Sequence, residues 1–235
     1  MKVEIWSDIF CPFCYIGKRR FENALKNFSD KDDVEVIYRS FELNPDAPKI
    51  NSNSIHEAIA DKYGMSVEEA KVNNDGIVRQ AAALGLEYNF DTLILTNSLD
   101  AHRLIHFAKY FNKMQEMTEA LFKAYFTESK NISDIDALGD IADGIGLDKK
   151  EAIEFLNSDK YKNEVREDEL LARKYGITSV PTFIFNDKFK VTGAQSEDIF
   201  LLALNKVLED DKALLDLKDK SNEGKNVCID GECGV

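Results

Sequence analysis

Apolar and polar positions alternate near both ends of the chain and recur with helical spacing between them. Residues 3–7 and 34–40 are rich in β-branched and aromatic side chains and predict two strands. Between them, apolar residues fall three and four positions apart after Pro12, a residue suited to the first turn of a helix. Strand, helix and strand in this order predict a β-α-β unit whose strands run parallel.

The middle of the chain shows only helical spacing. Pro45 and Pro48, two of the four prolines, mark the change of pattern. The amphipathic segments expected to form helices are 55–63, 66–84, 97–112, 114–127, 133–143 and 148–156. One more helix, 164–175, is expected to end at Gly176, because glycine favours the left-handed conformation of a C-terminal cap. The pattern therefore predicts a large all-helical insertion.

Strand spacing returns before the C-terminus. Residues 182–185 and 188–192 flank an Asn-Asp pair, which predicts an antiparallel hairpin. Ser196 is suited to cap a last helix, which is expected to end near Leu208 or Leu217. These elements form a second unit with the order strand, strand, helix.

The patterns together predict one α/β fold that the helical segment interrupts. We expect the N-terminal half of the fold in residues 1–44, the insertion in 45–165, the C-terminal half in 166–217 and a flexible tail in 218–235. A length of 235 residues is long for one average domain and short for two large ones, which also favours one domain with an insertion.

The composition is that of a soluble globular protein. Apolar residues make up 44% of the chain and charged residues 31%, and no apolar run is long enough to cross a bilayer. The net charge of −13 disfavours nucleic acid and anionic membranes as partners. Glu4 and Asp8 interrupt any apolar core of a secretory signal, so a cytoplasmic location is expected unless a leader has already been removed.

The most informative pair of residues is Cys11 and Cys14, separated by Pro12 and Phe13. The pair falls where a strand leads into a helix, and the unpaired amides and the dipole of that helix favour the thiolate of Cys11. Helical spacing turns Cys14 inward and leaves Cys11 at the exposed tip. Cys11 is therefore expected to attack a disulfide, and Cys14 is expected to resolve the mixed disulfide.

Two other interpretations of this pair are a couple of ordinary core cysteines and half of a zinc site. The chain has three histidines, none near the pair in sequence, which disfavours a zinc site of cysteine and histidine. No metal and no other cofactor is therefore expected. In a reducing cytosol, a paired-cysteine motif indicates catalysis, redox sensing or metal binding rather than a structural disulfide.

A second motif, residues 178–182, immediately precedes the third predicted strand. Its Pro181 cannot donate a hydrogen bond to a neighbouring strand. A cis bond before this proline would form a tight turn and leave the Val180 backbone free to pair with an extended peptide. The alternative is a trans proline that only begins the strand.

Four segments resemble the DsbA-like thioredoxin-fold proteins and, among them, the cytoplasmic FrnE-like disulfide oxidoreductases. They are 7–17, 101–104 after Asn97, 175–183 and 193–195. The resemblance covers essentially residues 1–208 and implies a thioredoxin fold, β-α-β then β-β-α, interrupted by a helical insertion. It also implies a disulfide oxidoreductase or isomerase, with protein disulfides or dithiols as substrates.

The resemblance further implies that the bond before Pro181 is cis and packs against the cysteine pair. It implies a substrate groove between the thioredoxin core and the insertion. Asn97, His102 and Arg103 match the family pattern and are expected at this groove. The expected substrate-binding residues are Val180, Pro181, Asn97 and His102.

Two positions depart from the related exported oxidants. Ile5 stands six residues before Cys11, where thioredoxins and exported DsbA proteins commonly carry a buried acid. Phe13 stands between the cysteines, where exported oxidants often carry histidine. Without that extra cation, the strongly oxidising character of the exported enzymes is not expected.

A sister branch with the same fold uses glutathione, and it includes hydroxychromene-carboxylate isomerases and kappa-class transferases. Those enzymes usually carry serine in place of Cys11 and lack the second cysteine, so the presence of both thiols favours disulfide exchange. Glutathione is retained as an alternative partner, and a redox-regulated chaperone as an alternative function. The protein is expected to be a monomer or a homodimer.

Two further features have several interpretations. His102 and His106 lie four positions apart, the spacing of two metal ligands on a helix, although neutral histidines at the surface or in the groove are preferred. Cys228 and Cys233 flank four residues that include a glycine, and they can form a second redox pair, a metal site or two idle thiols. FrnE-like relatives also carry such a pair, which favours the redox interpretation.

Overall fold

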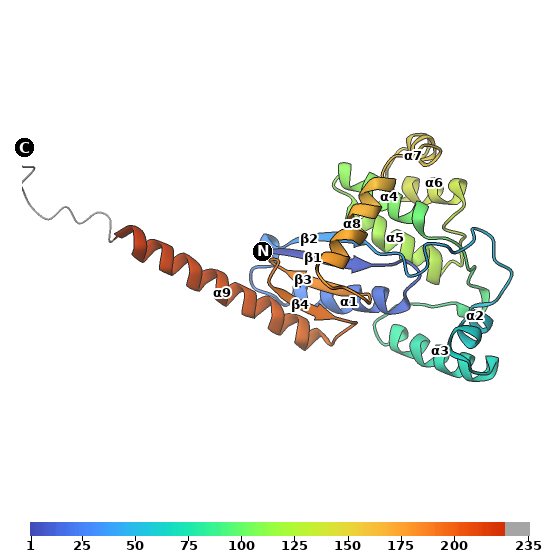
Figure 1. Ribbon diagram of the computed structural model, residues 1–235, viewed down its shortest axis with the longest axis horizontal. Coiled ribbons are helices and arrows are strands. Elements are labelled where there is room, and N and C mark those ends of the chain that lie inside the picture. The colour runs from blue at the N-terminus through green and yellow to red at the C-terminus, as the bar shows by residue number, and fades with distance from the viewer. Residues whose placement is uncertain (224–235) are drawn as a thin grey trace, which may run out of the picture.

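A four-stranded mixed sheet lies at the centre of the fold (Figure 1). The computed structural model describes residues 1–223, and Cys228 and Cys233 lie outside this part of the chain. The strands are β1 (Lys2–Ser7), β2 (Glu35–Ser40), β3 (Thr182–Phe185) and β4 (Phe189–Thr192). Their order is β2-β1-β3-β4, with β1 parallel to β2 and antiparallel to β3, and β3 antiparallel to β4.

Helices cover the sheet and form the insertion. Those at the sheet are α1 (Pro12–Lys26), α8 (Lys162–Lys174) and α9 (Glu197–Glu223). Those of the insertion are α2 (Ile55–Tyr63), α3 (Val67–Ala82), α4 (Leu99–Tyr110), α5 (Met114–Phe126), α6 (Ile135–Gly144) and α7 (Lys149–Leu156). The structure adds two short 3-10 helices that the sequence did not predict, Lys31–Asp33 and Phe90–Thr92.

Alternating side chains give the sheet two buried faces. On one face, the ring of Phe21 in α1 lies 5.5 Å from that of Phe183 in β3 and 5.7 Å from that of Phe200 in α9, measured between centroids. On the other face, the indole of Trp6 donates a 3.0 Å hydrogen bond to the carbonyl oxygen of Asp168 in α8. The sheet is thus enclosed by α1 and α9 on one side and by α8 on the other.

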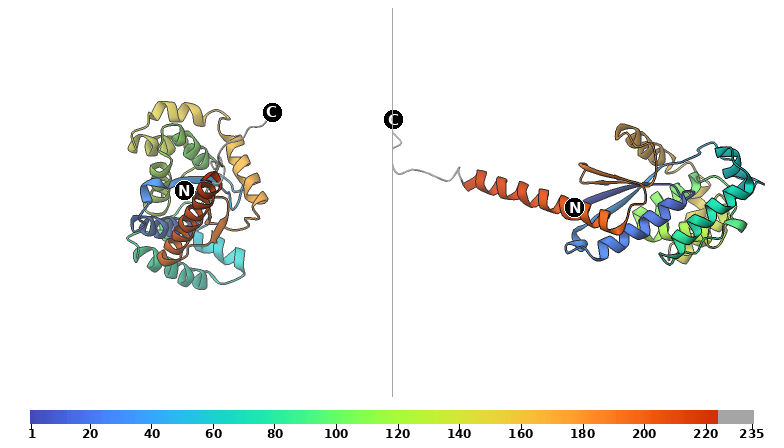
Figure 2. Two further views of the ribbon diagram at one scale, coloured as in Figure 1. Left: turned by 90° about the vertical axis from the view of Figure 1, so that its left-hand side faces the viewer. Right: turned by 90° about the horizontal axis from the view of Figure 1, so that it is seen from below.

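The insertion begins with two helices whose starting points are encoded locally. Ser54 and Ser66 each accept the amide of a glutamate three residues later, and that glutamate's carboxylate accepts the serine's amide. These capping boxes begin α2 and α3. Figures 1 and 2 show that α9 extends away from the sheet in the direction opposite to the insertion. Although α9 spans 27 residues, no helix in residues 1–223 is both long and apolar enough to cross a membrane.

The predicted fold class is confirmed as β-α-β, helical insertion and β-β-α. The hairpin turns at Asn186 and Asp187, whose φ angles of 47° and 57° lie in the left-handed region that these residue types tolerate. Gly176 follows α8 with a φ of 61°, as the predicted cap requires. The prediction for α9 was too short, because the helix continues to Glu223.

Candidate active site

Cys11 is the cap residue at the N-terminus of α1. Its extended backbone, with φ −87° and ψ 111°, ends the loop that follows β1, and Pro12 occupies the first turn. The amide of Cys11 donates to the carbonyl of Asp8 at 3.1 Å, and the amide of Cys14 donates to the carbonyl of Cys11 at 2.9 Å. Proline suits this position because the first-turn amide has no partner within the helix. The sequence therefore sets both sulfurs at the start of one helix.

The loop before β3 faces the first of these sulfurs. The Val180–Pro181 peptide bond is cis. The thiol of Cys11 donates to the carbonyl oxygen of Val180, with 3.6 Å between sulfur and oxygen. The carbonyl of Pro181 accepts the amide of Gly193 at 2.8 Å, which ties the loop to the end of β4. Two motifs that lie about 170 residues apart in sequence thus meet at one sulfur.

The two thiols differ in their surroundings less than the sequence predicted. Cys11 is 6% exposed and Cys14 is 2% exposed, so the expectation that Cys11 forms an exposed tip is wrong. Cys11 is covered because the Val180 carbonyl lies against it and the insertion approaches from another side. Phe13, at 40%, is the exposed residue of the motif.

Burial is the largest influence on the pKa of the Cys14 thiol. Burial raises the pKa of the Cys14 thiol well above its usual value, and the neighbouring Cys11 sulfur raises it further. The hydroxyl of Ser7 and the backbone amide of Asp8 act in the opposite direction. Cys14 is therefore a protonated thiol at neutral pH.

A groove of about 480 Å³ opens beside Cys11, between the start of α1 and helices α2 and α3. Its walls are mostly apolar, and they include Phe10, Phe13, Ile59, Ile77, Tyr125 and Phe126. Lys62 is the one basic side chain among the residues that line it. A groove thus lies where the resemblance implied one, and it suits an apolar side chain better than a multiply charged ligand.

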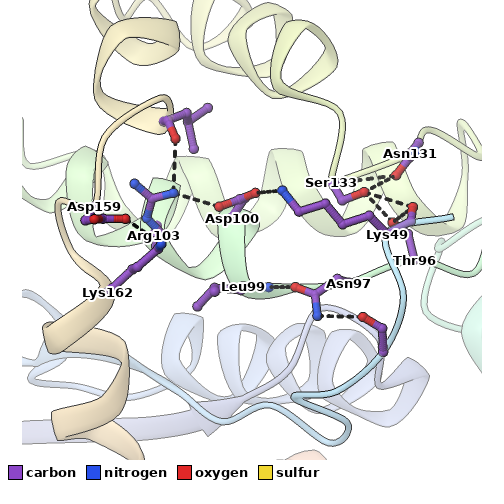
Figure 3. A network of polar contacts seen from close by, with 12 residues as sticks. Lys49, Thr96, Asn97, Leu99, Asp100, Arg103, Asn131, Ser133, Asp159 and Lys162 are labelled. Carbon is purple, nitrogen blue, oxygen red and sulfur yellow. Dashed lines mark hydrogen bonds and ion pairs between the residues drawn. The ribbon is translucent and has the colours of Figure 1, made fainter.

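Asn97 and His102 do not belong to the lining of this groove. The side-chain amide of Asn97 donates to the carbonyls of Pro45 at 3.3 Å and Ala47 at 3.0 Å, and its oxygen accepts the amide of Leu99 (Figure 3). It thereby fixes the loop that follows β2 to the start of α4. His102 is buried and faces Asp8. A direct role of either residue in substrate binding stays a prediction.

Arg103 is buried in a polar network at the base of the insertion (Figure 3). Its guanidinium pairs with Asp100 at 2.7 Å, and Asp100 in turn pairs with Lys49 at 2.7 Å. The same guanidinium donates to the carbonyl oxygens of Phe155, Leu156, Ser158 and Lys160. Arg103 therefore joins α4 to the segment between α7 and α8, away from the groove expected for it.

The two histidines of α4 each face a carboxylate from a distant part of the chain. His102 Nε2 lies 3.4 Å from Asp8 Oδ1, and His106 Nε2 lies 3.1 Å from Asp168 Oδ2. Both histidines are buried, so the expectation of surface or groove histidines is wrong. Within the described residues, no three His, Cys, Asp or Glu side chains are grouped to hold a metal.

Sequence reasoning also missed Tyr88, which stabilises the turn at Pro12 between the two cysteines. Its hydroxyl donates to the carbonyl oxygen of Pro12 at 2.7 Å, and its ring stacks on Phe126 with centroids 4.6 Å apart. Tyr88 lies in the loop between α3 and α4, where no periodic pattern indicates which residues point inward. The insertion therefore supports the turn that holds both cysteines.

Comparison with known proteins identifies the family. The model of the DSBA-like thioredoxin domain matches residues 2–205. The chain belongs to this family. Among curated relatives, the Bacillus subtilis protein YwbO is 33% identical over 207 residues, which cover 86% of this chain and 95% of YwbO. The DSBA-like family thus accounts for the sheet, the insertion and the start of α9.

Solved structures give the same fold. The probable DsbA oxidoreductase SCO1869 from Streptomyces coelicolor is 39% identical, covers 89% of this chain and 90% of its own, and superposes with a TM-score of 0.85. The cytosolic disulfide reductase DsbM from Pseudomonas aeruginosa, solved with GSH, is 13% identical and has a TM-score of 0.63, with 89% of this chain and 100% of its own covered. At that identity, the likeness to DsbM shows the fold alone. The protein therefore has the DsbA-like thiol–disulfide oxidoreductase fold.

Helix α1 contacts the loop that contains Pro181 (the proline loop) at Gly17, and this contact can be tested. A Cβ atom on Gly17 would lie 2.9 Å from the ring carbon Cγ of Pro181 and 3.4 Å from the backbone of Ala194. Because a proline ring cannot rotate away, Gly17→Val should lower the free energy of unfolding by about 2–3 kcal/mol, as overpacking does. Urea unfolding measures this loss.

The matched control is Gly76→Val in α3, where the nearest atom to an added Cβ is Arg79 Nη2 at 3.8 Å. There we expect a change within about 1 kcal/mol, since valine has the higher helix propensity. Equal stability of the Gly17→Val and Gly76→Val proteins would show that α1 does not press against the proline loop.

Proposed function

We propose that the protein is a thiol–disulfide oxidoreductase in which Cys11 attacks a protein disulfide and Cys14 resolves the mixed disulfide. The observation that carries this proposal is the position of the Cys11 sulfur. It caps the N-terminus of α1, lies 3.6 Å from the Val180 carbonyl beside Pro181, and has a second thiol one helical turn away. Membership of the DSBA-like family supports the same reaction.

The reaction consists of two exchanges of sulfur for sulfur. The thiolate of Cys11 attacks one sulfur of the substrate disulfide, and the other substrate sulfur leaves with the electron pair of the broken bond. Cys14 then loses its proton and attacks the Cys11 sulfur, which releases the second substrate sulfur and forms a Cys11–Cys14 disulfide. The substrate gains two electrons and the enzyme loses them; the reverse sequence oxidises a substrate dithiol.

The substrate would be held by two neighbouring surfaces. The Val180 segment precedes β3, and an extended peptide can pair with such a segment through backbone hydrogen bonds. The apolar groove lies on the other side of Cys11 and can accept a side chain adjacent to the reacting cysteine. Together they favour protein substrates over small thiols. A cytoplasmic location is part of this proposal.

The tail is proposed to supply a second redox pair. If Cys228 and Cys233 exchange with the Cys11–Cys14 disulfide within one molecule, the tether raises their effective concentration to the millimolar range. Dilute external thiols then compete poorly. Metal binding and two idle thiols remain the alternatives for this pair.

Comparing the rates of disulfide reduction and of glutathione-dependent reactions distinguishes the proposed function from a glutathione-dependent one. We expect the protein to accelerate the reduction of insulin disulfides and to leave two glutathione-dependent reactions at their background rates. These are conjugation of an aromatic electrophile and isomerisation of a hydroxychromene carboxylate. One reason is that both thiols are present. The other is that, among residues 1–223, Lys62 is the sole basic residue lining the groove, whereas glutathione carries two carboxylates.

A glutathione transferase rate well above background that persists in a Cys14→Ser protein would replace the proposal with the glutathione-dependent function. Peptide binding that persists in a Cys11→Ser protein, without any insulin reduction by the parent, would indicate a chaperone instead.

A further inference from the structure

The resolving step needs a place for the proton of Cys14. A thiol attacks a disulfide only as the thiolate. Burial raises the pKa of Cys14, and the residue is 2% exposed, so bulk water does not collect this proton directly. A buried group behind the thiol must take it.

A small cavity lies between the ends of β1 and β2 and helices α4 and α5, and it is lined by Ser7 and Ile9 of the segment that leads to the cysteine pair. Its volume of about 10 Å³ suits a single water molecule, which needs polar partners around it. The lining includes the polar residues Ser7, Tyr38, Ser40, His102 and Thr118. It also includes Arg39, whose charge is paired with Glu4 and Asp168. The cavity thus connects the strand that leads to the cysteines with the buried face of α4.

Ser7 joins this cavity to Cys14. Its hydroxyl is buried and has no hydrogen-bond partner of normal geometry among the described residues. Ser7 ends β1 and lines the cavity, and its hydroxyl lowers the pKa of the Cys14 thiol against the effect of burial. A hydroxyl both donates and accepts, so it can pass a proton between the sulfur and a water in the cavity.

His102 lies across the cavity and is paired with Asp8. The carboxylate of Asp8 is fully buried and is fixed by the amides of Phe10 at 3.2 Å and Leu43 at 2.7 Å. Its Oδ1 faces His102 Nε2 at 3.4 Å. A carboxylate in this position orients the imidazole and makes its other ring nitrogen a stronger base.

Other carboxylates around His102 also raise its pKa. Burial lowers the pKa of His102, but Asp8, Glu42 and Glu169 outweigh burial and raise it above the ordinary value. Glu42 is itself buried, one of its oxygens has no partner among the described residues, and burial raises its pKa. Arg166 pairs with both glutamates and is 44% exposed. This row of groups leads from the cavity toward the surface.

We propose that the Asp8–His102 pair takes up the thiol proton of Cys14 during resolution, through Ser7 and one water in the cavity. The S–H bond of Cys14 breaks and the proton ends on the imidazole. The resulting thiolate attacks the Cys11 sulfur of the mixed disulfide, and the substrate sulfur leaves with the electron pair. His102 acts through Ser7 and water and is a positioning residue. This inference rests on the proposed function.

The test uses a parent in which Cys228 and Cys233 are replaced by serine, because these thiols would also react. It follows two releases of coloured nitrothiobenzoate from dithiobis(nitrobenzoate). The first release reports the attack by Cys11, and the second reports resolution by Cys14. In His102→Gln, we expect an unchanged first phase and a second phase slowed about a hundred-fold, because the acceptor at the end of the proton path is lost. In the parent, the second phase should slow as pH falls through the pKa of His102, which the neighbouring carboxylates raise above its ordinary value. His102→Gln should lose this inflection.

The matched control is His106→Gln, one turn further along α4 and likewise buried against a carboxylate. His106 does not line the cavity and contacts it only through the hydroxyl of Ser40, at 3.2 Å. It should leave both phases unchanged. Ser7→Ala should slow only the second phase and should keep the inflection in the pH dependence of that phase. This variant tests the proton path even if His102→Gln fails to fold. A second phase of parental rate in a folded His102→Gln or Ser7→Ala protein, or equal slowing in His106→Gln, would overturn the proposal. Absence of the first phase in the parent would instead refute the proposed function.

Discussion

Replacing Cys11 by serine should reduce the rate of insulin disulfide reduction by about a thousand-fold or more, because the nucleophile is lost. Cys11 is the thiol that faces both the Val180 carbonyl and the groove. Cys14, at 2% exposed, lies one turn inside α1, where a substrate disulfide does not reach it. No other group in this turn replaces the Cys11 sulfur.

Cys14→Ser is the matched variant, because it changes the same atom one helical turn away. With Cys228 and Cys233 also replaced by serine, it should fail to turn over, consume one substrate disulfide per enzyme molecule and stop as a mixed disulfide. Rates are measured by the turbidity of reduced insulin, with free thiols counted after each reaction. Parental activity of the Cys11→Ser protein would exclude Cys11 as the nucleophile.

The second large effect is expected on stability, at Arg103. Truncation by Arg103→Ala would leave the buried Asp100 without its guanidinium partner and would remove one hydrogen bond from each of four carbonyl oxygens. Of these four, the carbonyl of Phe155 would still accept from the amide and the hydroxyl of Ser158. Breaking a buried pair from one side typically costs about 3–5 kcal/mol, and we expect the free energy of unfolding to fall by that amount. The cause is the loss of a buried cation and of its hydrogen bonds to Asp100 and to the carbonyls. Lys49 still pairs with Asp100, but from a largely exposed position.

Urea unfolding followed by circular dichroism measures this loss. Arg173→Ala is the control, because Arg173 lies exposed in the last turn of α8, and there we expect a change within about 0.5 kcal/mol. A loss below about 1 kcal/mol for Arg103→Ala would mean that water replaces the guanidinium at little cost. The network would then contribute little to holding the insertion in place.

Much of the fold follows from local sequence. The strand β1 and helix α1 are visible as a change from alternation to helical spacing at Pro12, and the hairpin is visible as an Asn-Asp pair between two short runs. The cysteine motif and Pro181 were found in the same way, because each has a characteristic residue at a characteristic boundary. Such signals lie within a few neighbouring residues and require no knowledge of distant contacts.

Long-range packing explains what the sequence missed. Cys11 is buried because the Val180 carbonyl and the wall of the groove come from segments far along the chain, and no local pattern shows this. The spacing of His102 and His106 correctly places them on one face of α4. It cannot show that Asp8, 94 residues away, faces one of them.

The most direct test of the central claim is to trap the mixed disulfide. The Cys14→Ser protein is mixed with a peptide that contains one disulfide, quenched in acid, digested without reductant and mapped by tandem mass spectrometry. We predict one adduct, with the peptide joined to the sulfur of Cys11. An adduct on Cys228 or Cys233 with Cys11 left as a free thiol, or no adduct at all, would contradict the assignment of Cys11 as the attacking residue.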